Sequence, residues 1–545
     1  MKVAAVRHKI TQLQGTNNTT TQRIFYPTGF GIPQACMFIG VGVGVTQQLG
    51  IATTTQVYND QNLSIGFVGR DSRTGFANTA HSCHIYTRQG QTSEQSRNGV
   101  NQQKGFAAWR FTATTTYNEI MSGTAFTFDS DSLRYTYVET GGGAGASEPT
   151  FELDLICIFF GGTGFSAGIG TFNMPTAVNG GIGLSFLWQP ELIIGAGQGT
   201  ASLIAANTAR ANVMSLGITG RNRFGNSYAP ANTPASIYST FAQYSGVVSN
   251  NRVGIGTDLW MKGIVAAATQ LTTPSTAGGA AITNMTWGAT GISVFTRNTT
   301  AVANNLQTFM GLRFDEPYKF DYFFTPAGTG RTFINLGFVP QFVLGCSTGN
   351  TLLQVFPEST PDHLQASVDT ITYWVAQGPS DLGKYNYGVG TISTTNGSTS
   401  LSGSGTSFFG QLNEADYIYD SNYNLVGIVS TISANTSGLF KSGANSTVTN
   451  SNWFYREYGQ YSAVFGGNDG ANPTVPRGAT GYTALQTFDI ATSTGNTIID
   501  SGSIITFDGS PGFYIDYGIV TSTRRKLNWY LAFGAEQRER RRATG

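Results

Sequence analysis

Residues 29–40 read GFGIPQACMFIG, an aromatic residue followed by proline and then by a run of apolar side chains. Residues 185–195, SFLWQPELIIG, and residues 336–346, LGFVPQFVLGC, repeat this order. Proline cannot donate to the middle of a strand ladder but suits its first position, so each stretch predicts the start of an apolar strand. Because an internal repeat decides the architecture of a chain, these stretches predict three modules of one kind.

Further landmarks recur downstream of these openings in the same order. The stretch SIGFVGR at residues 64–70 matches SLGITGR at residues 215–221. A strand pair and an apolar closing strand then end each module. The pairs are FTFDSDSLRYTY (126–137), MTWGATGISVFT (285–296) and ITFDGSPGFYIDY (505–517), and the closing strands LDLICIFFGG, LQTFMGLRF and LNWYLAFG end at positions 162, 314 and 534. Independent matches in one order indicate a true repeat.

The third module is longer than the other two. From the opening proline to the aromatic residue of the strand pair there are 95 residues in the first module, 97 in the second and 167 in the third. The extra length corresponds to residues 388–457, which have their own strand alternation and turns. Insertions are tolerated at exposed loop tips, where the two chain ends lie close together. We therefore predict a small inserted domain here.

The rest of the pattern is typical of sheets. Helix signals are almost absent, and Gly, Asn, Pro and Ser interrupt short runs of alternating residues. We predict an all-β chain of three tandem β-sandwich, jelly-roll-like modules, the third with an inserted small β-barrel. Residues 1 to about 22 read as a polar arm that orders on a neighbour. The predicted limits are 1–164 for this arm and module 1, 165–316 for module 2, 317–537 for module 3, 388–457 for the barrel and 538–545 for a basic tail.

The composition restricts the function classes. Only 11% of residues are charged, against roughly 25% in typical soluble proteins, and the net charge is +1. This balance excludes the electrostatic footprint of a dedicated nucleic-acid binder or a membrane-surface protein. No apolar run has signal-peptide or membrane-spanning length, so we expect synthesis in a cytoplasm. The four scattered cysteines read as reduced core residues: Cys36, Cys83, Cys157 and Cys346.

The opening strands and the closing pattern W/F-x-x-x-F-G resemble β-sandwich modules of tailed-phage virion proteins. The inserted run GTISTTNGSTSLSGSGTSF, followed by DYIY and GIVSTI, is similar to small β-barrels that decorate phage tail, fibre and capsid-surface proteins. The resemblance implies a virion protein made in the host bacterial cytoplasm, with assembly and surface display as its role. Its expected partners are other capsid or tail subunits and further copies of itself, because repeated parts follow the symmetry of a particle.

Three glycine-rich matches carry little chemistry. Residues 164–168 match the G-x-S-x-G nucleophile pattern, but the following sequence does not start the helix that pattern requires. Residues 378–384 match G-x-x-x-x-G-K, yet Tyr385 replaces the Ser or Thr that would hold magnesium. Residues 40–44, GVGVG, read as a close-packed or bulged strand rather than a phosphate loop.

The remaining candidates are metal ligands, carboxylate pairs and a basic tail. His81, Cys83 and His84 are the only metal-like cluster, but on one strand His84 points away from the other two. Close carboxylates that could cleave a glycan are Glu152 with Asp154, Asp315 with Glu316, and Glu414 with Asp416, and each reads as a solvated element. The tail RERRR at residues 538–542 reads as a solvated end or docking arm.

We therefore expect a structural, non-enzymatic component of a bacteriophage virion exterior, without catalytic, cofactor-binding or metal-binding residues. The first alternative is a receptor-binding or glycan-binding tail protein, which exposed Trp or Tyr clusters around the inserted barrel would favour. A second alternative is a glycan-depolymerising tail enzyme, which requires a cleft with paired carboxylates. A third is a bacterial surface adhesin, which the missing signal peptide disfavours.

Overall fold

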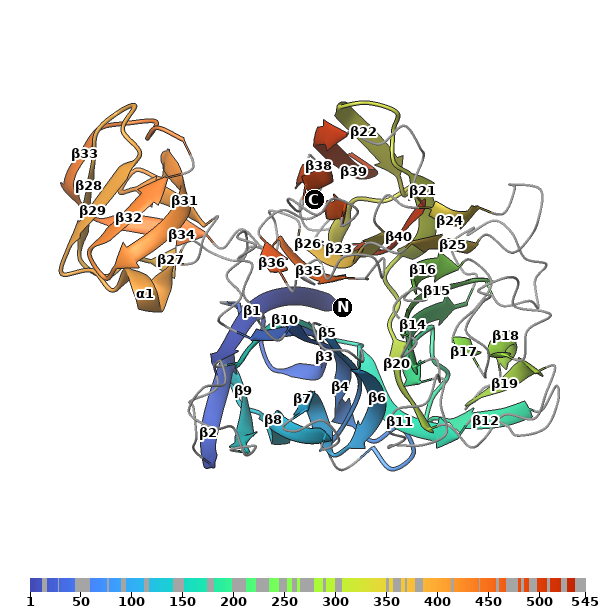
Figure 1. Ribbon diagram of the computed structural model, residues 1–545. Helices are drawn as coiled ribbons and strands as arrows, with labels where there is room; N and C mark the ends of the chain where they lie inside the picture. Colours follow the sequence, from blue (N-terminus) through green and yellow to red (C-terminus); the bar gives the residue numbers. More distant parts are fainter. Residues whose placement is uncertain are drawn as a thin grey trace, which may run out of the picture.

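The computed structural model confirms the all-β fold, with three β-sandwich modules and a barrel inserted in the third (Figure 1). The described residues are 1–11, 17–27, 29–44, 59–75, 78–89, 95–111, 117–140, 151–173, 181–198, 212–221, 235–244, 252–256, 262–264, 279–287, 291–298, 306–348, 352–355, 364–367, 370–377, 386–412, 416–440, 442–456, 460–466, 479–481, 485–489, 497–506, 510–520 and 527–534. All strand pairs between them are antiparallel.

Module 1 has a six-stranded sheet, in the order β1-β10-β3-β4-β5-β6, and a four-stranded sheet, in the order β2-β9-β8-β7. The first two strands pair with the last two in opposite sheets, as in a jelly roll, whereas β3 to β6 form a meander. The strands are β1 (Lys2–Thr11), β2 (Asn18–Phe25), β3 (Pro33–Gly44), β4 (Asn59–Arg70), β5 (Asn78–Gln89), β6 (Gln95–Gln102), β7 (Lys104–Phe111), β8 (Tyr117–Phe128), β9 (Ser132–Glu139) and β10 (Phe151–Gly161).

Module 2 repeats this topology with the orders β11-β20-β13-β14-β15-β16 and β12-β19-β18-β17. Its six-stranded sheet is extended because β16 pairs with the β25–β24 hairpin from module 3. The strands are β11 (Ser166–Asn173), β12 (Gly181–Ser185), β13 (Leu192–Gln198), β14 (Asn212–Gly220), β15 (Ala235–Tyr244), β16 (Arg252–Gly256), β17 (Lys262–Ile264), β18 (Gly279–Trp287), β19 (Gly291–Asn298) and β20 (Leu306–Arg313).

Module 3 follows the same plan, with the orders β21-β40-β23-β26-β35-β36 and β22-β39-β38-β37. The sequence landmarks thus fall on corresponding third, fourth, eighth, ninth and tenth strands, while the exact domain limits stay a prediction. The strands are β21 (Tyr318–Phe324), β22 (Gly330–Asn335), β23 (Pro340–Thr348), β24 (Leu352–Val355), β25 (Leu364–Ser367), β26 (Thr370–Gln377), β35 (Tyr461–Gly466), β36 (Ala479–Gly481), β37 (Leu485–Asp489), β38 (Thr497–Thr506), β39 (Gly512–Val520) and β40 (Leu527–Gly534).

The three six-stranded sheets face one another around a shared apolar core (Figure 1). In β3, Met37 and Ile39 belong to this central core, whereas Cys36 and Phe38 belong to the interior between the two sheets of module 1. A strand buried on both faces carries continuous apolar residues rather than an alternation. This explains the unbroken runs around Cys36 and in LDLICIFF, and all four cysteines are free and buried as expected.

One aromatic side chain joins the cores of the three modules. The ring of Phe533 on β40 lies with its centroid 6.2 Å from that of Phe160, 5.7 Å from that of Phe314 and 6.4 Å from that of Phe342. Phe160 belongs to module 1, Phe314 follows the last strand of module 2 and Phe342 lies in module 3. The modules therefore share packing that each would lose alone.

Hydrogen bonds close the three modules into a ring in a cyclic order. After the fourth strand of module 1, the Ser72 amide donates to the Ile169 carbonyl on the first strand of module 2 (2.9 Å). After the fourth strand of module 2, the Arg221 carbonyl accepts from the Tyr318 hydroxyl of module 3 (2.5 Å). At the fourth strand of module 3, the Gln377 side-chain amide donates to the Ala5 carbonyl of module 1 (2.8 Å). The last module thus returns to the first.

The expected polar arm at residues 1–22 is wrong. β1 pairs with β10 along its whole length and β2 pairs with β9. Val3 and Ala5 are buried in the central core, while Ala4 and Val6 are buried in the interior of module 1. The Met1 ammonium contacts the buried Glu316 carboxylate, so this end of β1 is fixed against the link between modules 2 and 3. With both faces buried, the short KVAAV run lacks the alternation by which a strand is recognised.

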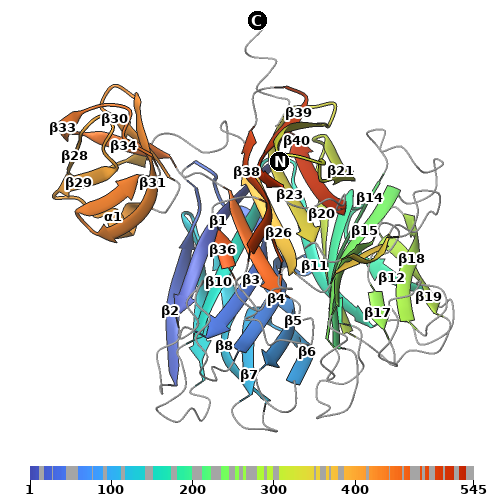
Figure 2. The ribbon, with the colours of Figure 1, turned by 45° about the horizontal axis from the view of Figure 1, so that its top comes forward.

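The inserted domain is a nearly closed barrel with the strand order β27-β34-β30-β31-β32-β29-β28-β33. The two ends of this order lie close together, because β33 leads through Asn452 directly into β34, which pairs with β27. Figures 1 and 2 show it beside the ring of modules. It has its own apolar core. Its elements are β27 (Asn386–Tyr387), β28 (Thr391–Thr394), β29 (Ser400–Ser404), α1 (Phe408–Gln411), β30 (Tyr417–Asp420), β31 (Leu425–Ala434), β32 (Ser437–Phe440), β33 (Val448–Ser451) and β34 (Trp453–Arg456).

The barrel is inserted in the hairpin between β26 and β35, which pair in the six-stranded sheet of module 3. Its first and last strands pair with each other, with Asn386 opposite Tyr455 and Tyr387 opposite Phe454. Entry and exit of the insert therefore lie side by side, which is the geometry that lets a loop tip carry a folded domain. The corresponding hairpins are β4–β5 in module 1 and β14–β15 in module 2.

Candidate functional site

The barrel carries a group of aromatic side chains on its outside, which we call the aromatic surface. Its members are Tyr387 on β27, Tyr419 on β30, Tyr423 in the turn after β30, and Phe454 on β34. Tyr387 is 59% exposed and Tyr423 is 51% exposed. The Phe454 ring stacks on Tyr423 at 4.5 Å between centroids and meets Tyr387 edge to face at 5.4 Å.

Strand register places these rings on one face. Ile418 of β30 is fully buried in the barrel core, so its neighbour Tyr419 points outward. Tyr419 lies opposite Phe454, and Phe454 lies opposite Tyr387. Trp453, next to Phe454, is fully buried and points the other way. The alternation that fills the core with Ile418 and Trp453 thus gathers the remaining aromatics outside.

The turn that holds Tyr423 is braced by one carboxylate. Asp420 Oδ1 accepts hydrogen bonds from the Asn422 amide (2.8 Å) and the Asn424 amide (2.9 Å), and Asp420 Oδ2 accepts from Asn424 Nδ2 (3.2 Å). Tyr423 adopts the left-handed region with φ of 64°, which is uncommon for a residue other than glycine. The braced turn therefore holds an exposed tyrosine in a conformation that it would seldom adopt alone.

The floor beneath the aromatic surface is tightly packed. The Trp453 indole donates to the Val389 carbonyl (3.3 Å), and the Gly388 amide donates to the Trp453 carbonyl (2.9 Å). A Cβ on Gly388 would lie 2.0 Å from Trp453 Cε2, so only glycine lets the strand approach the indole. Gln411 of α1 donates to the Tyr387 carbonyl and accepts from the Val389 amide. These contacts fix β27 and its tyrosine.

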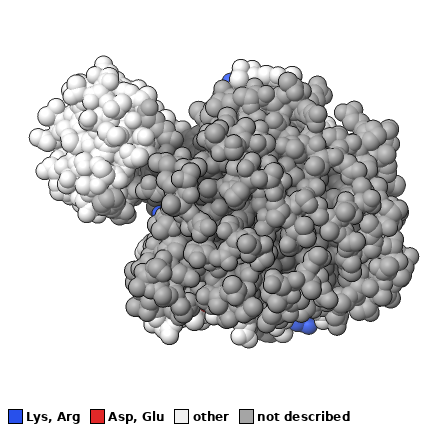
Figure 3. All heavy atoms as spheres, viewed as in Figure 1, with Lys and Arg blue, Asp and Glu red and all other residues white. Residues whose placement is uncertain are grey.

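The barrel surface carries little charge. Residues 386–456 include five charged side chains, and among those described Asp416 is buried while Asp420 braces the turn. On the side of the barrel that faces the viewer in Figure 3, the described atoms are neither acidic nor basic. Ser421, Asn422 and Asn424, which flank Tyr423, are exposed. The aromatic rings are therefore bordered by neutral hydrogen-bonding groups.

The sequence motifs with possible chemistry lie elsewhere. Ser166 of the G-x-S-x-G match begins β11, which pairs with β20 and continues as a strand to Asn173. The helix required for a nucleophile elbow is replaced by that strand. Residues 378–385, the G-x-x-x-x-G-K match and Tyr385, lie outside the described residues, as does the basic tail at 538–545.

Two glycines of the GVGVG run are closely packed, as one of the two readings predicts. A Cβ on Gly40 would lie 2.5 Å from Leu155 Cδ2, and a Cβ on Gly42 would lie 2.4 Å from Phe151 Cε1. Both belong to β3, whose register with β4 and β10 is regular here. The run is a strand that lets neighbouring side chains approach.

The histidine and cysteine cluster does not converge. Cys83 is buried in the central core, His81 Nε2 lies 3.0 Å from Thr79 Oγ1, and His84 stacks on Trp109 with ring centroids 5.1 Å apart. Burial lowers the pKa of His81 to about 4 and the pKa of His84 to about 3. Across the described ranges, no group of three or more His, Cys, Asp or Glu side chains could hold a metal ion.

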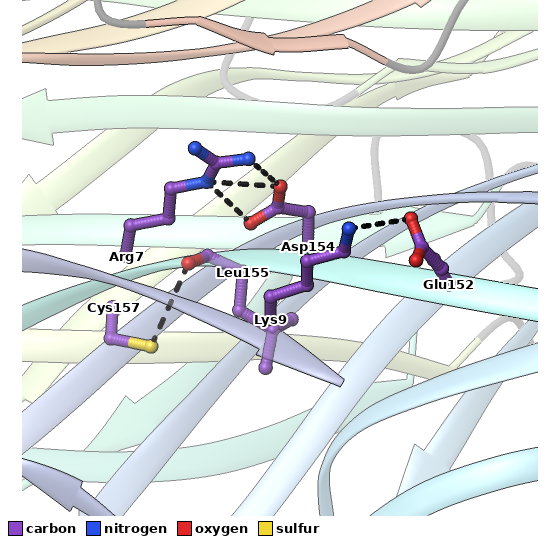
Figure 4. A network of polar contacts seen from close by, with 6 residues as sticks. All are labelled: Arg7, Lys9, Glu152, Asp154, Leu155 and Cys157. Atoms are coloured by element: carbon purple, nitrogen blue, oxygen red, sulfur yellow. Dashed lines mark hydrogen bonds and ion pairs between the residues drawn. The ribbon is translucent and has the colours of Figure 1, made fainter. Parts of the chain in front are cut away.

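The carboxylates on β10 are paired with cations from β1 (Figure 4). Asp154 accepts hydrogen bonds from Arg7 Nε at 2.9 and 3.0 Å, and Glu152 lies 2.7 Å from Lys9 Nζ. An acid/base pair for glycan cleavage needs carboxylates whose proton affinities differ and which face a substrate. These two carboxylates instead form ion pairs between neighbouring strands.

In the other two carboxylate pairs, the described carboxylates are held by contacts within the fold or are buried. Glu316 accepts from the Asp315 amide (3.2 Å) as well as contacting the Met1 ammonium. Asp416 is buried at the start of β30, while Glu414 lies outside the described residues.

In the part of the chain that the structure describes, no helix has the length and apolar character needed to cross a membrane.

No protein-family model matches this chain, and no curated protein matches its sequence. Among solved structures, the chain is similar to one described as the structure of the Macrobrachium rosenbergii nodavirus, with 10% identity and a TM-score of 0.11. The match covers 57% of this chain and 96% of that chain. A likeness at this TM-score supports no inference about fold or function, so the proposals below depend on the residues themselves.

Proposed function

We propose that this chain is a structural component of a bacteriophage virion exterior, which acts through assembly contacts and by holding its barrel out for display. The observation that carries the proposal is the barrel itself: it is inserted at a hairpin tip, has its own core and lies beside the ring (Figure 2). A domain placed in this way is presented without disturbing the packing that holds the ring together.

The ring suits a part that must persist outside a cell. Its three modules share one apolar core and are linked in cyclic order by hydrogen bonds. With 11% charged residues in the chain, contacts to neighbouring subunits must rely on apolar burial and neutral hydrogen bonds. Such contacts respond weakly to salt, because screening acts on exposed charges. We expect several copies on each particle, following its symmetry.

The test is labelling of particles purified from cultures that produce this chain, with an antibody against residues 388–457 and electron microscopy. Label over the head supports a capsid-decorating part, and label confined to the tail supports a tail or fibre part. An immunoblot of the same particles reports chains whose barrel the antibody cannot reach. Absence of the chain from purified particles in that immunoblot would overturn the proposal.

A further inference from the structure

We propose that the aromatic surface of the barrel binds an uncharged saccharide chain. Saccharide binding goes beyond the proposed virion role, and it can be measured on the purified protein without a particle. The two faces of a sugar ring carry C–H groups, and aromatic rings offer flat, polarisable partners for such groups. Tyr387 and Tyr423 are more than half exposed and are held on either side of Phe454.

The border of the surface supplies the polar half of the recognition. Ser421, Asn422 and Asn424 are exposed beside Tyr423 and can donate to and accept from sugar hydroxyls. Surfaces rich in Tyr, Ser, Asn and Gly combine rigid aromatic contact with adaptable hydrogen bonding, and antibody combining sites use this composition. The charged side chain described in this turn, Asp420, is acidic, so like-charge repulsion disfavours sulfated, phosphorylated or carboxylated chains.

The aromatic surface is organised before any ligand arrives. Asp420 ties the turn to the Asn422 and Asn424 amides, and the Tyr423 amide donates to the Asp420 carbonyl (3.0 Å). The left-handed backbone of Tyr423 is thereby maintained together with its stacking on Phe454. A ring that is already in place loses little conformational freedom on binding, which increases affinity for a weakly interacting ligand.

The size of the surface favours a saccharide over a protein partner. Stable protein interfaces use roughly 20–30 residues on each side, with an apolar centre. Here four aromatic side chains, bordered by exposed polar residues, make a narrow strip on strands β27, β34 and β30. A strip of this kind fits a chain of a few sugar rings.

The experiment uses the purified full chain on an array of neutral and acidic oligosaccharides, followed by calorimetric titration with the best neutral oligosaccharide. The key variant is Tyr423→Gly, because glycine adopts the left-handed turn without strain and removes only the ring. We expect at least a tenfold loss of affinity in Tyr423→Gly and in Tyr387→Ala, and retention within about twofold in Tyr423→Phe, which keeps the ring.

Leu439→Ala is the matched control, since Leu439 is 47% exposed on β32 of the same barrel, outside the aromatic surface. Its affinity should equal that of the parent chain. Absence of binding to every neutral oligosaccharide, or equal binding by the Tyr423→Gly variant, would overturn the saccharide proposal. The saccharide proposal would also fail if the chain captured a virion protein and the Tyr423→Gly variant did not. That result would show that the aromatic surface binds protein. None of these results depends on the particle labelling, so the two proposals fail separately.

Discussion

The ring of three modules and the inserted barrel are both made of short antiparallel strands, but they are stabilised on different scales. The ring has a core to which all three modules contribute, and its last module bonds back to its first. Among the described residues, the barrel has a separate core of eleven buried side chains, and it is inserted in the hairpin between β26 and β35. The comparison teaches that one chain can combine an interdependent ring with a domain that responds alone.

A fall in pH should produce the largest difference in stability between the ring and the barrel. Burial lowers the pKa of His8 to about 4, against the opposing effect of Asp154, and lowers those of His81 and His84 as well. In the unfolded chain these imidazoles take up protons near pH 6.5, so the ring loses stability as the pH falls from there toward about 4. Each lowered pKa unit corresponds to about 1.4 kcal/mol when fully expressed.

Residues 386–456 contain no histidine, so the barrel should not follow the ring through this pH range. Hydrogen exchange measured by mass spectrometry at pH 7 and at lower pH reports both regions in one sample. We expect protection in β1, β5 and β10 to fall while protection in the barrel persists. Equal loss of protection in the barrel would contradict the assignment of the acid response to these histidines.

Phe533→Ala should lower the free energy of unfolding of the three-module ring by about 3–5 kcal/mol. The substitution removes the aromatic side chain that contacts all three modules. Urea unfolding with the same exchange readout measures the effect. All three modules should lose protection together, since their core is shared. If module 3 alone responded, the shared core would not couple the modules.

Phe408→Ala is the converse change. Phe408 is fully buried in the barrel, with its ring 5.6 Å from that of Trp453. Its truncation should destabilise the barrel by about 3–5 kcal/mol and leave the unfolding midpoint of the ring unchanged. Parallel destabilisation of the ring would show that the barrel is energetically coupled to it.

Tyr318→Phe should give the smallest effect, about 1–2 kcal/mol in the ring. The Tyr318 hydroxyl donates to the carbonyls of Glu191 (2.9 Å) and Arg221 (2.5 Å), which join module 3 to module 2. Denaturant unfolding of the variant checks the magnitude, and Tyr322→Phe, at a half-buried position on the same strand, serves as a comparison. No change in stability would mean that this junction depends on packing alone.

The sequence predicted the repeated fold because its landmarks are local. An aromatic residue, a proline and an apolar run mark the third strand of every module, whichever partners surround it. β1 was missed for a physical reason: KVAAV is buried on both faces, so it shows no alternation, and the residues after it are polar. The strand conformation of β1 is determined by its tertiary environment rather than by local sequence propensity.

From the sequence, exposed aromatic residues around the insert could be named as a sign of glycan binding, but the particular residues that form the aromatic surface could not be predicted. Exposed tyrosines around the insert were a criterion for glycan binding, but Tyr387, Tyr423 and Phe454 come from three separate segments. Their convergence depends on the pairing of β27 and β30 with β34 and on the left-handed turn at Tyr423. Neither the pairing register nor that backbone angle can be read from a single sequence.

The adjacent ends of the barrel make the hairpin between β26 and β35 a natural grafting point for protein engineering. Because β27 and β34 pair at the base of the insert, any small domain whose termini lie about one strand spacing apart, roughly 5 Å, has the geometry to replace it. The corresponding β14–β15 hairpin of module 2 occupies the same topological position. The ring therefore offers a scaffold on which two different cargoes could be carried at a fixed separation.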